Sequence, residues 1–310
     1  MSTIPGYVDL QVNGHNGADF SSPQLTGDEV VRATEQLLAA GTVVFLPTLI
    51  TASPELYRRN ITLIRKAITK AGLPRHVPGV HLEGPFLSSQ PGAVGCHDPM
   101  FIQPPDPGVL DRILAETGNF IRLLTVAADQ PGAENLIRHA RNKGIAVSLG
   151  HHLADVEQIR RAADAGAQAL THLGNGVPNQ LDRHRNPIWA GLADDRLTAM
   201  IITDGHHLPA EVIKCMIRVK GADKIIVVSD ASPITGFPPG RYHALGNDAI
   251  LEPNGKFHNP VKNCLVGSAS TMAQCMTYLA SLGILTPEEL VMVSHNNPLR
   301  LIDYHVYDQQ

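Results

Sequence analysis

Residues 133–172 read AENLIRHARNKGIAVSLGHHLADVEQIRRAADAGAQALTH, and one pattern occurs in them twice. An amphipathic stretch ends at Gly144 and is followed by a short apolar run, residues 145–149. The order then recurs, with a second amphipathic stretch that ends at Gly166 before the apolar run 167–171. Glycine directly after the last helical residue is a common way for a helix to end. Short apolar runs that alternate with helices are typical of parallel strands joined by helical crossovers.

The same alternation extends over most of the chain. Eight strands are predicted at residues 7–13, 42–47, 77–83, 120–126, 145–149, 167–171, 197–203 and 224–229. Helices are predicted at residues 27–40, 54–71, 108–117, 133–143, 153–165 and 209–220. Eight such units close most naturally into a (β/α)₈ TIM barrel, whereas a doubly wound open sheet, the alternative, usually has fewer strands. We expect residues 1–310 to form a single barrel domain, with a long loop at 174–195 and a small β-hairpin inserted within 241–266.

Composition excludes several classes of protein. Of the 310 residues, 43% are hydrophobic and 17% are charged, which is ample material for a core and excludes disorder. A net charge of −4 without a long basic run argues against nucleic-acid or anionic-membrane partners. No stretch approaches the ~18 apolar residues of a membrane span, and the N-terminus lacks the features of a signal peptide. Four cysteines without a C-x-x-C pair are no disulfide framework, so we expect a reduced, cytoplasmic setting.

Polar side chains gather where the predicted strands end. The carboxyl ends of barrel strands carry the active site, and here they hold Asp9, Gln11, Asn13, His81, Glu83, His151, His152, His172, Asp204, His206, His207 and Asp230. Two histidines plus one carboxylate, with a position left open for water, are a ligand set for catalytic zinc, and they also suit iron, cobalt or manganese. A single histidine at a strand end is more often structural. Several polar groups that face one mouth favour the metal, because burying unpaired carboxylates is costly.

Other motifs have a simpler explanation. Gly174-Asn175-Gly176 is an ordinary turn unless other residues support it, and Arg185 would normally be a solvated loop charge. Cys96 beside His97 is a weak suggestion of a nucleophile and its base, because sequence neighbours seldom meet in an attack geometry.

Longer sequence motifs resemble those of a known family. They are PGYVDLQVNG at 5–14, LPT at 46–48, HLEGPF at 81–86, GCHDP at 95–99, GH at 150–151, THLGN at 171–175, DGHH at 204–207, VSDA at 228–231, LVGS at 265–268 and NP at 297–298. These motifs occur in the family's order, and through them the chain resembles the N-acetylglucosamine-6-phosphate deacetylases of the amidohydrolase superfamily. The resemblance implies a metal-dependent TIM barrel that hydrolyses the N-acetyl group of N-acetylglucosamine 6-phosphate to glucosamine 6-phosphate and acetate.

The resemblance also implies roles for individual residues at the reacting bond. Glu83, His151 and His172 match the metal ligands, and Asp230 matches the catalytic carboxylate. One divalent ion is expected, Zn²⁺ first, with Fe²⁺, Co²⁺ and Mn²⁺ as alternatives. Such an ion makes a better nucleophile of its water, and Asp230 would carry the proton from that water to the departing amine.

Five further residues match the family's substrate site. His97 matches the histidine that contacts the sugar, and Asn175 with the amide of Gly176 matches part of the phosphate site. Arg185 and His207 match residues that reach the phosphate from a neighbouring subunit, which implies a homodimer with a shared active site.

The chain departs from the pattern at several points. Many amidohydrolases have His-x-His on the first strand, where this chain has Gln11 and Asn13, so we expect one metal rather than two. Family members usually carry a small β-sandwich, which we expect this chain to lack. Gly174 stands where the family has an aromatic residue, and the loop at 178–185 is longer than usual. These changes leave open a deacylase for a different N-acyl amino sugar, or a non-catalytic relative that binds sugar phosphates.

Overall fold

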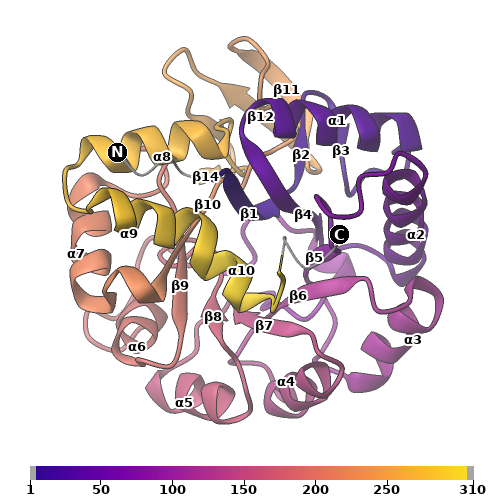
Figure 1. Cartoon of the computed structure of the whole chain (residues 1–310). Coiled ribbons are helices and arrows are strands. Elements are labelled where there is room, and N and C mark those ends of the chain that lie inside the picture. Colours follow the sequence, from indigo (N-terminus) through magenta and orange to yellow (C-terminus); the bar gives the residue numbers. More distant parts are fainter. Residues whose placement is uncertain (1–4, 306–310) are drawn as a thin grey trace.

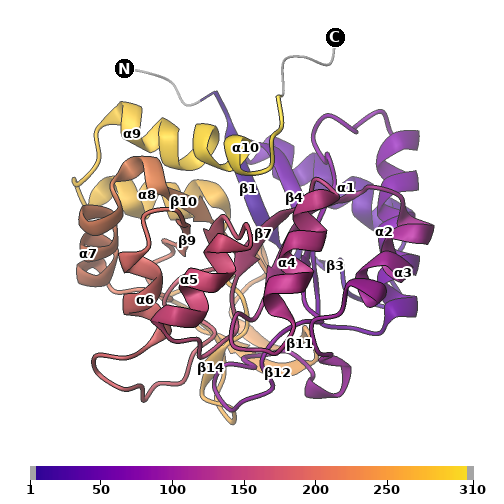
Figure 2. The same ribbon diagram turned by 90° about the horizontal axis from the view of Figure 1, so that it is seen from below.

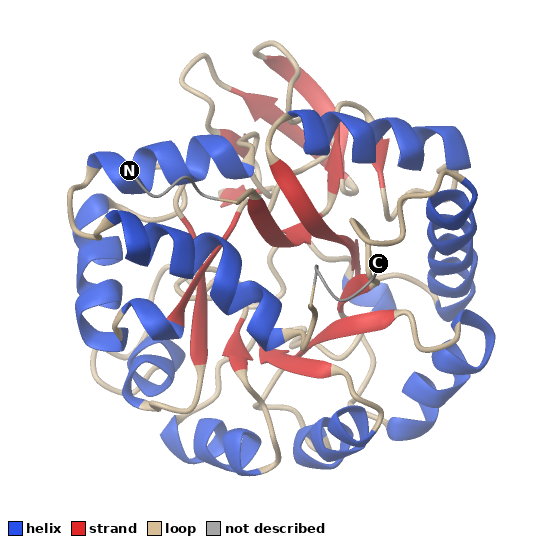
Figure 3. Cartoon of the chain, viewed as in Figure 1, coloured by secondary structure: helices blue, strands red, loops and turns tan. Residues whose placement is uncertain are grey.

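The computed structural model describes residues 5–305 and shows a barrel of eight parallel strands. The strands are β1 (Tyr7–Val12), β4 (Thr42–Ile50), β5 (Val80–Glu83), β6 (Ile121–Val126), β7 (Ala146–Leu149), β8 (Ala169–Leu170), β9 (Thr198–Ile202) and β10 (Ile225–Val228). They pair in chain order, and a bridge between Val12 and Ala231 joins the last strand's end to the first. Figures 1 and 3 show the strands inside a ring of helices. The predicted TIM barrel is therefore confirmed, with all eight strands where the sequence places them.

Ten α-helices lie in the described part of the chain. They are α1 (Gly27–Ala39), α2 (Pro54–Lys70), α3 (Pro107–Thr117), α4 (Ala133–Asn142), α5 (Val156–Asp164), α6 (Pro187–Ala193), α7 (Ala210–Lys220), α8 (Met272–Ser281), α9 (Pro287–Val291) and α10 (Asn297–Leu301). Three short turns of other helix types are η1 (Pro99–Phe101), η2 (Ala222–Lys224) and η3 (Met292–Asn296). The six predicted helices all form. Four helices, α6, α8, α9 and α10, are not among the predicted ones. Of these, α6 lies within the predicted 174–195 loop, and its seven residues, like the five each of α9 and α10, are too few to show a period.

One end of the barrel is closed by apolar side chains. Alternate strand residues such as Leu10, Leu46 and Val228 point inside and are fully buried. Leu301 and Tyr304, at the end of α10 and just beyond it, pack against this interior cluster. The polar strand ends therefore open only at the other end.

A small antiparallel sheet lies at that other end. It contains β11 (Gly240–Ala244), β12 (Asn247–Leu251), β13 (Phe257–Asn259) and β14 (Cys264–Leu265), paired in this order. Figure 2 shows it at the opposite end of the barrel from α9 and α10. The predicted hairpin lies at the right place in the chain, but the observed sheet has four strands. The additional strands, β13 and β14, have only three and two residues and show no alternation of apolar and polar side chains. A hairpin of β2 (Gly14–His15) and β3 (Ala18–Asp19) follows β1.

No helix within residues 5–305 combines the length and the apolar character that a bilayer crossing requires.

Candidate active site

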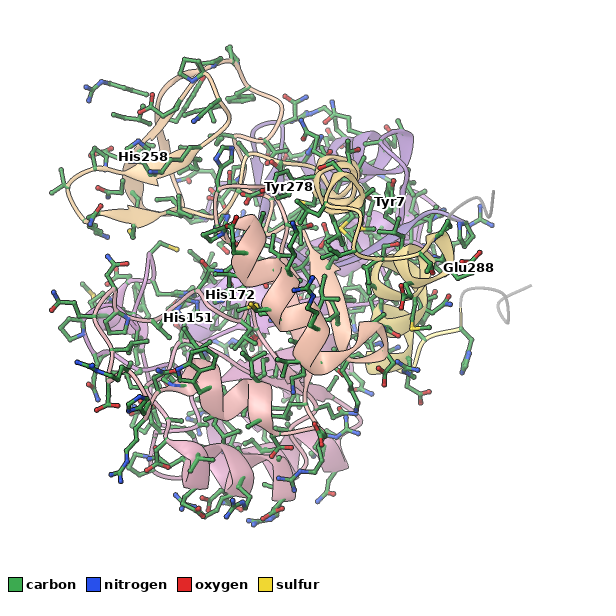
Figure 4. All side chains as sticks on the ribbon, turned by 90° about the vertical axis from the view of Figure 1, so that its left-hand side faces the viewer. Tyr7, His151, His172, His258, Tyr278 and Glu288 are labelled. Atoms are coloured by element: carbon green, nitrogen blue, oxygen red, sulfur yellow. The ribbon has the colours of Figure 1, made fainter. Side chains whose placement is uncertain are left out.

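The three predicted metal ligands converge at the open end of the barrel. Glu83 is the last residue of β5, and His151 and His172 follow β7 and β8. Glu83 Oε1 lies 2.9 Å from His172 Nε2 and 3.2 Å from His151 Nε2, and the two Nε2 atoms are 3.0 Å apart. All three side chains are buried. Figure 4 shows His151 and His172 side by side inside the molecule.

Their hydrogen bonds show that these residues fit a cation. His151 Nδ1 lies 2.7 Å from the carbonyl oxygen of Ala93, which can only accept, so Nδ1 carries the proton. In the neutral form of this tautomer, Nε2 points its lone pair toward the carboxylate of Glu83. Such a backbone contact is typical of a metal-binding histidine, because it fixes the tautomer and the orientation of the ring. A divalent ion would satisfy the carboxylate and both Nε2 atoms at once.

His97 belongs to the same cluster but presents a hydrogen-bond donor instead of a lone pair. Its ligand atom lies within 4.8 Å of those of Glu83 and His151, so distance alone would make these three a metal site. However, the backbone N–H of Thr51 donates to His97 Nδ1 at 3.2 Å, which leaves the proton of the neutral ring on Nε2. Burial lowers the pKa of His97 to about 3 and keeps the ring neutral. His97 therefore presents an N–H rather than a lone pair, which separates it from the ligands.

Asp230 lies in the same cavity, just after β10. Its Oδ1 accepts a hydrogen bond of 2.7 Å from Asn13 Nδ2. Burial and the negative charge of Glu83 raise the pKa of Asp230 to about 6, against the opposing effect of His172. A carboxyl group poised in this way can take up and release a proton near neutral pH.

The backbone is strained at three of these positions. The φ angles of His151, His172 and Asp230 are 53°, 32° and 51°, in the left-handed region that side chains rarely adopt. Each residue lies two positions beyond the last residue of a strand, and each lines the cavity at the barrel mouth. Strain of this kind clusters at functional sites. The sequence gives no sign of this strain, because none of the three residues is a glycine.

The converging residues line a cavity of about 650 Å³. Its lining includes Glu83, His97, His151, His172, Asn175, Gly176, His207 and Asp230. Gly176 has φ 63°, and a Cβ there would lie 3.0 Å from His151 Nδ1, so this turn allows only glycine close to the site. The Gly-Asn-Gly segment is therefore part of the cavity wall.

His207 and Arg185, which the resemblance places in a neighbouring subunit, differ in their position relative to the cavity. His207 lines the cavity of its own chain, and its Nδ1 is 2.7 Å from Asp204 Oδ2. Burial raises the pKa of Asp204, but hydrogen bonds from His207 and from backbone amides outweigh it and bring the pKa to about 2. Arg185 is exposed and does not line this cavity.

Sequence reasoning missed the supporting residues. The Nε2 of Gln11 donates to Glu83 Oε1 at 3.1 Å and so orients the carboxylate. Asn13 does the same for Asp230. Their position at the end of the first strand was the available signal, because the ends of all eight strands meet at one mouth. By contrast, His81 is a structural histidine: its Nε2 lies 2.8 Å from Thr125 Oγ1, and burial lowers its pKa to about 4.

Comparison with known proteins agrees with this geometry. No model of a protein family matches the chain. It is 31% identical to the N-acetylglucosamine-6-phosphate deacetylase of Bos taurus, over 96% of this chain and 74% of the relative. The chain belongs to the N-acetylglucosamine-6-phosphate deacetylase family. It is thus an amidohydrolase-type enzyme built on a TIM barrel.

Two further relatives bear on the substrate of this family member. The N-acetylgalactosamine-6-phosphate deacetylase of Escherichia coli O157:H7 is 29% identical over 96% of the chain and 77% of the relative. The structure of a mutant N-acetyl-D-glucosamine-6-phosphate deacetylase from Mycobacterium smegmatis, in complex with N-acetyl-D-glucosamine-6-phosphate, superposes with a TM-score of 0.88 at 30% identity. That superposition covers 97% of this chain and 78% of the M. smegmatis chain. The chain is thus similar to enzymes named for two epimeric sugars.

Proposed function

We propose that this chain hydrolyses the N-acetyl amide of N-acetylglucosamine 6-phosphate to glucosamine 6-phosphate and acetate. The observation that carries the proposal is that Glu83, His151, His172 and Asp230 line one cavity in a chain of the deacetylase family. A carboxylate and two lone-pair donors beside a second carboxylate suit metal-assisted hydrolysis of an amide.

In this proposal Glu83, His151 and His172 hold one divalent ion, Zn²⁺ first, with Fe²⁺, Co²⁺ and Mn²⁺ as alternatives. When bound, the ion lowers the pKa of its water and polarises the acetamide carbonyl. Gln11 and Asn13 are occupied by Glu83 and Asp230, which supports one ion rather than two.

Asp230 is proposed as the proton carrier. Asn13 binds its Oδ1, while no side chain or backbone group in the described part of the chain is bonded to Oδ2. That oxygen is free to accept the proton of the attacking water and then to deliver it to the sugar nitrogen as the amide breaks. General acid–base catalysis by one positioned group contributes about 10²- to 10⁴-fold to a rate.

The remaining predicted residues are proposed to bind the substrate. The Nε2–H of His97 would donate a hydrogen bond to the sugar. Asn175, the amide of Gly176 and His207 would bind the phosphate, and Arg185 would do so from the partner subunit of a homodimer. Holding the phosphate away from the reacting bond turns binding energy into orientation.

Acetate release tests the proposal. The zinc-loaded enzyme should release acetate from N-acetylglucosamine 6-phosphate faster than from unphosphorylated N-acetylglucosamine. N-acetylgalactosamine 6-phosphate is assayed in parallel, because the E. coli relative is named for that epimer. Preference for the galacto epimer would move the assignment to the second sugar. Absence of acetate release from all three compounds would contradict the proposed function.

A further inference from the structure

Two lysines of the small sheet line the cavity that holds the metal ligands. Lys256 follows the turn between β12 and β13, and Lys262 lies between β13 and β14. Figure 4 shows His258, on β13, on the same side of the molecule as His151 and His172, while Tyr7 and Glu288 lie on the other side. We propose that Lys256 and Lys262 bind the phosphate of the substrate from within the same chain. This inference rests on the proposed function and adds two residues to it.

Lys262 is held in place from two directions. Its backbone N–H donates to Asn259 Oδ1 at 3.0 Å, and its Nζ donates to Asn247 Oδ1 at 2.7 Å. Asn247 and Asn259 are only 2% and 5% exposed. Asn247 Nδ2 also donates to the carbonyl oxygen of Cys96 at 3.2 Å, so Lys262 is tied to the loop that carries His97. An ammonium group has three N–H donors, and the hydrogen bond to Asn247 uses one of them.

Lys256 lines the same cavity as His207. Its backbone N–H donates to Asn254 Oδ1 at 3.0 Å, which fixes the turn. The carbonyl oxygen of Asn254 lies 3.0 Å from His206 Nε2, so the turn packs on the loop that carries His207. The turn that carries Lys256 therefore packs on the loop of His207, and the two residues line the same cavity.

The charges around the cavity favour an anion at these lysines. No carboxylate among the described residues lies within ion-pair distance of either ammonium group, although Glu252 on β12 pairs with His258 at 3.0 Å. The carboxylates of the lining are Glu83 and Asp230, which face the proposed metal. Arginine does not occur among the lining residues, and Arg185 of the same chain is exposed elsewhere. A phosphate dianion would give the two lysines the charge-assisted partners that the protein does not supply.

The test is the KM of a double variant, Lys256→Met with Lys262→Met, which keeps the length of both side chains. We expect KM for N-acetylglucosamine 6-phosphate to rise about tenfold, with kcat and the turnover of unphosphorylated N-acetylglucosamine within twofold of the original. Inorganic phosphate should also inhibit the variant less strongly as a competitor. Lys70→Met, in the exposed last turn of α2, is the matched control and should change none of these. The two single variants divide the effect between the lysines.

Two results would overturn the inference. One is an unchanged KM for the phosphorylated sugar in the double variant. The other is an equal loss with the phosphorylated and the unphosphorylated sugar, which would mean that the lysines only shape the loop. If the original enzyme releases no acetate at all, the proposed function fails instead. Calorimetric binding of N-acetylglucosamine 6-phosphate, which should be about tenfold weaker in the double variant, then still tests the lysines.

Discussion

The two ends of the barrel are built from the same eight strands, but they bury opposite kinds of side chain. At one end Leu301 and Tyr304 pack on an interior of aliphatic residues. At the other end Glu83, His172 and Asp230 are buried together, although such groups are costly to remove from water. The first end follows the rule for a stable core. The second end departs from this rule, because it buries charged and polar side chains together, and these side chains form the candidate active site.

Asp230→Asn should have a large effect that falls on catalysis alone. An amide cannot take a proton from water, so kcat should drop by about 10³-fold while bound metal and Tm stay the same. Stopped assays of acetate release with elemental analysis of the same sample measure both quantities. Asp195→Asn, at an exposed position, is the control. Activity within tenfold of the original would remove Asp230 from its role.

Glu83→Ala should abolish metal binding at the polar end. It removes the only carboxylate among the three proposed ligands and leaves Gln11 without its acceptor. Metal content measured after gel filtration should fall from about one ion per chain to near zero, with activity lost in parallel. Retention of stoichiometric metal by this variant would show that the ion binds elsewhere.

Leu301→Ala should affect the apolar end and spare the site. Leu301 is 8% exposed within the interior cluster, so the truncation should lower the free energy of unfolding by about 2 kcal/mol. Urea denaturation measures the loss, and kcat should not change. A large drop in kcat at equal stability would contradict this expectation, because it would show that the apolar end affects catalysis at the polar end.

Asp9→Asn should give the smallest effect, a change in the pH dependence of stability. Burial raises the pKa of Asp9 to about 7, despite hydrogen bonds from Ser229 and Gln11 that lower it. Between about pH 4 and pH 7 the unfolded chain has lost this proton while the folded chain keeps it, so the free energy of unfolding should fall as pH rises. Denaturation at several pH values should show this fall in the original chain and a flatter profile in the variant. Equal slopes in the two proteins would mean that Asp9 does not titrate in this window.

The sequence could predict the barrel and the converging residues, because both follow from periodicity. Glycines after the helices locate the units, and the end of each strand locates Glu83 and Asp230. The backbone turns at His151 and His172 could not be predicted, because a positive φ at a residue other than glycine depends on tertiary packing.

Contacts between distant residues were also beyond the sequence. The proton on His97 Nε2 is set by Thr51, which lies on a different loop. The position of Lys262 depends on the buried Asn247 in a sheet whose last strands are too short to show a pattern. That His207 reaches the phosphate from a neighbouring subunit stays a prediction; within its own chain it lines the cavity and contacts Asp204.

Anomalous diffraction from crystals of the zinc-loaded protein would locate the metal ion and its ligands. We predict one strong peak per chain within about 2.0–2.2 Å of Glu83 Oε and of the Nε2 atoms of His151 and His172, with His97 Nε2 outside the coordination sphere. A peak bound by His97 in place of His172, or a peak away from Glu83, would contradict the account.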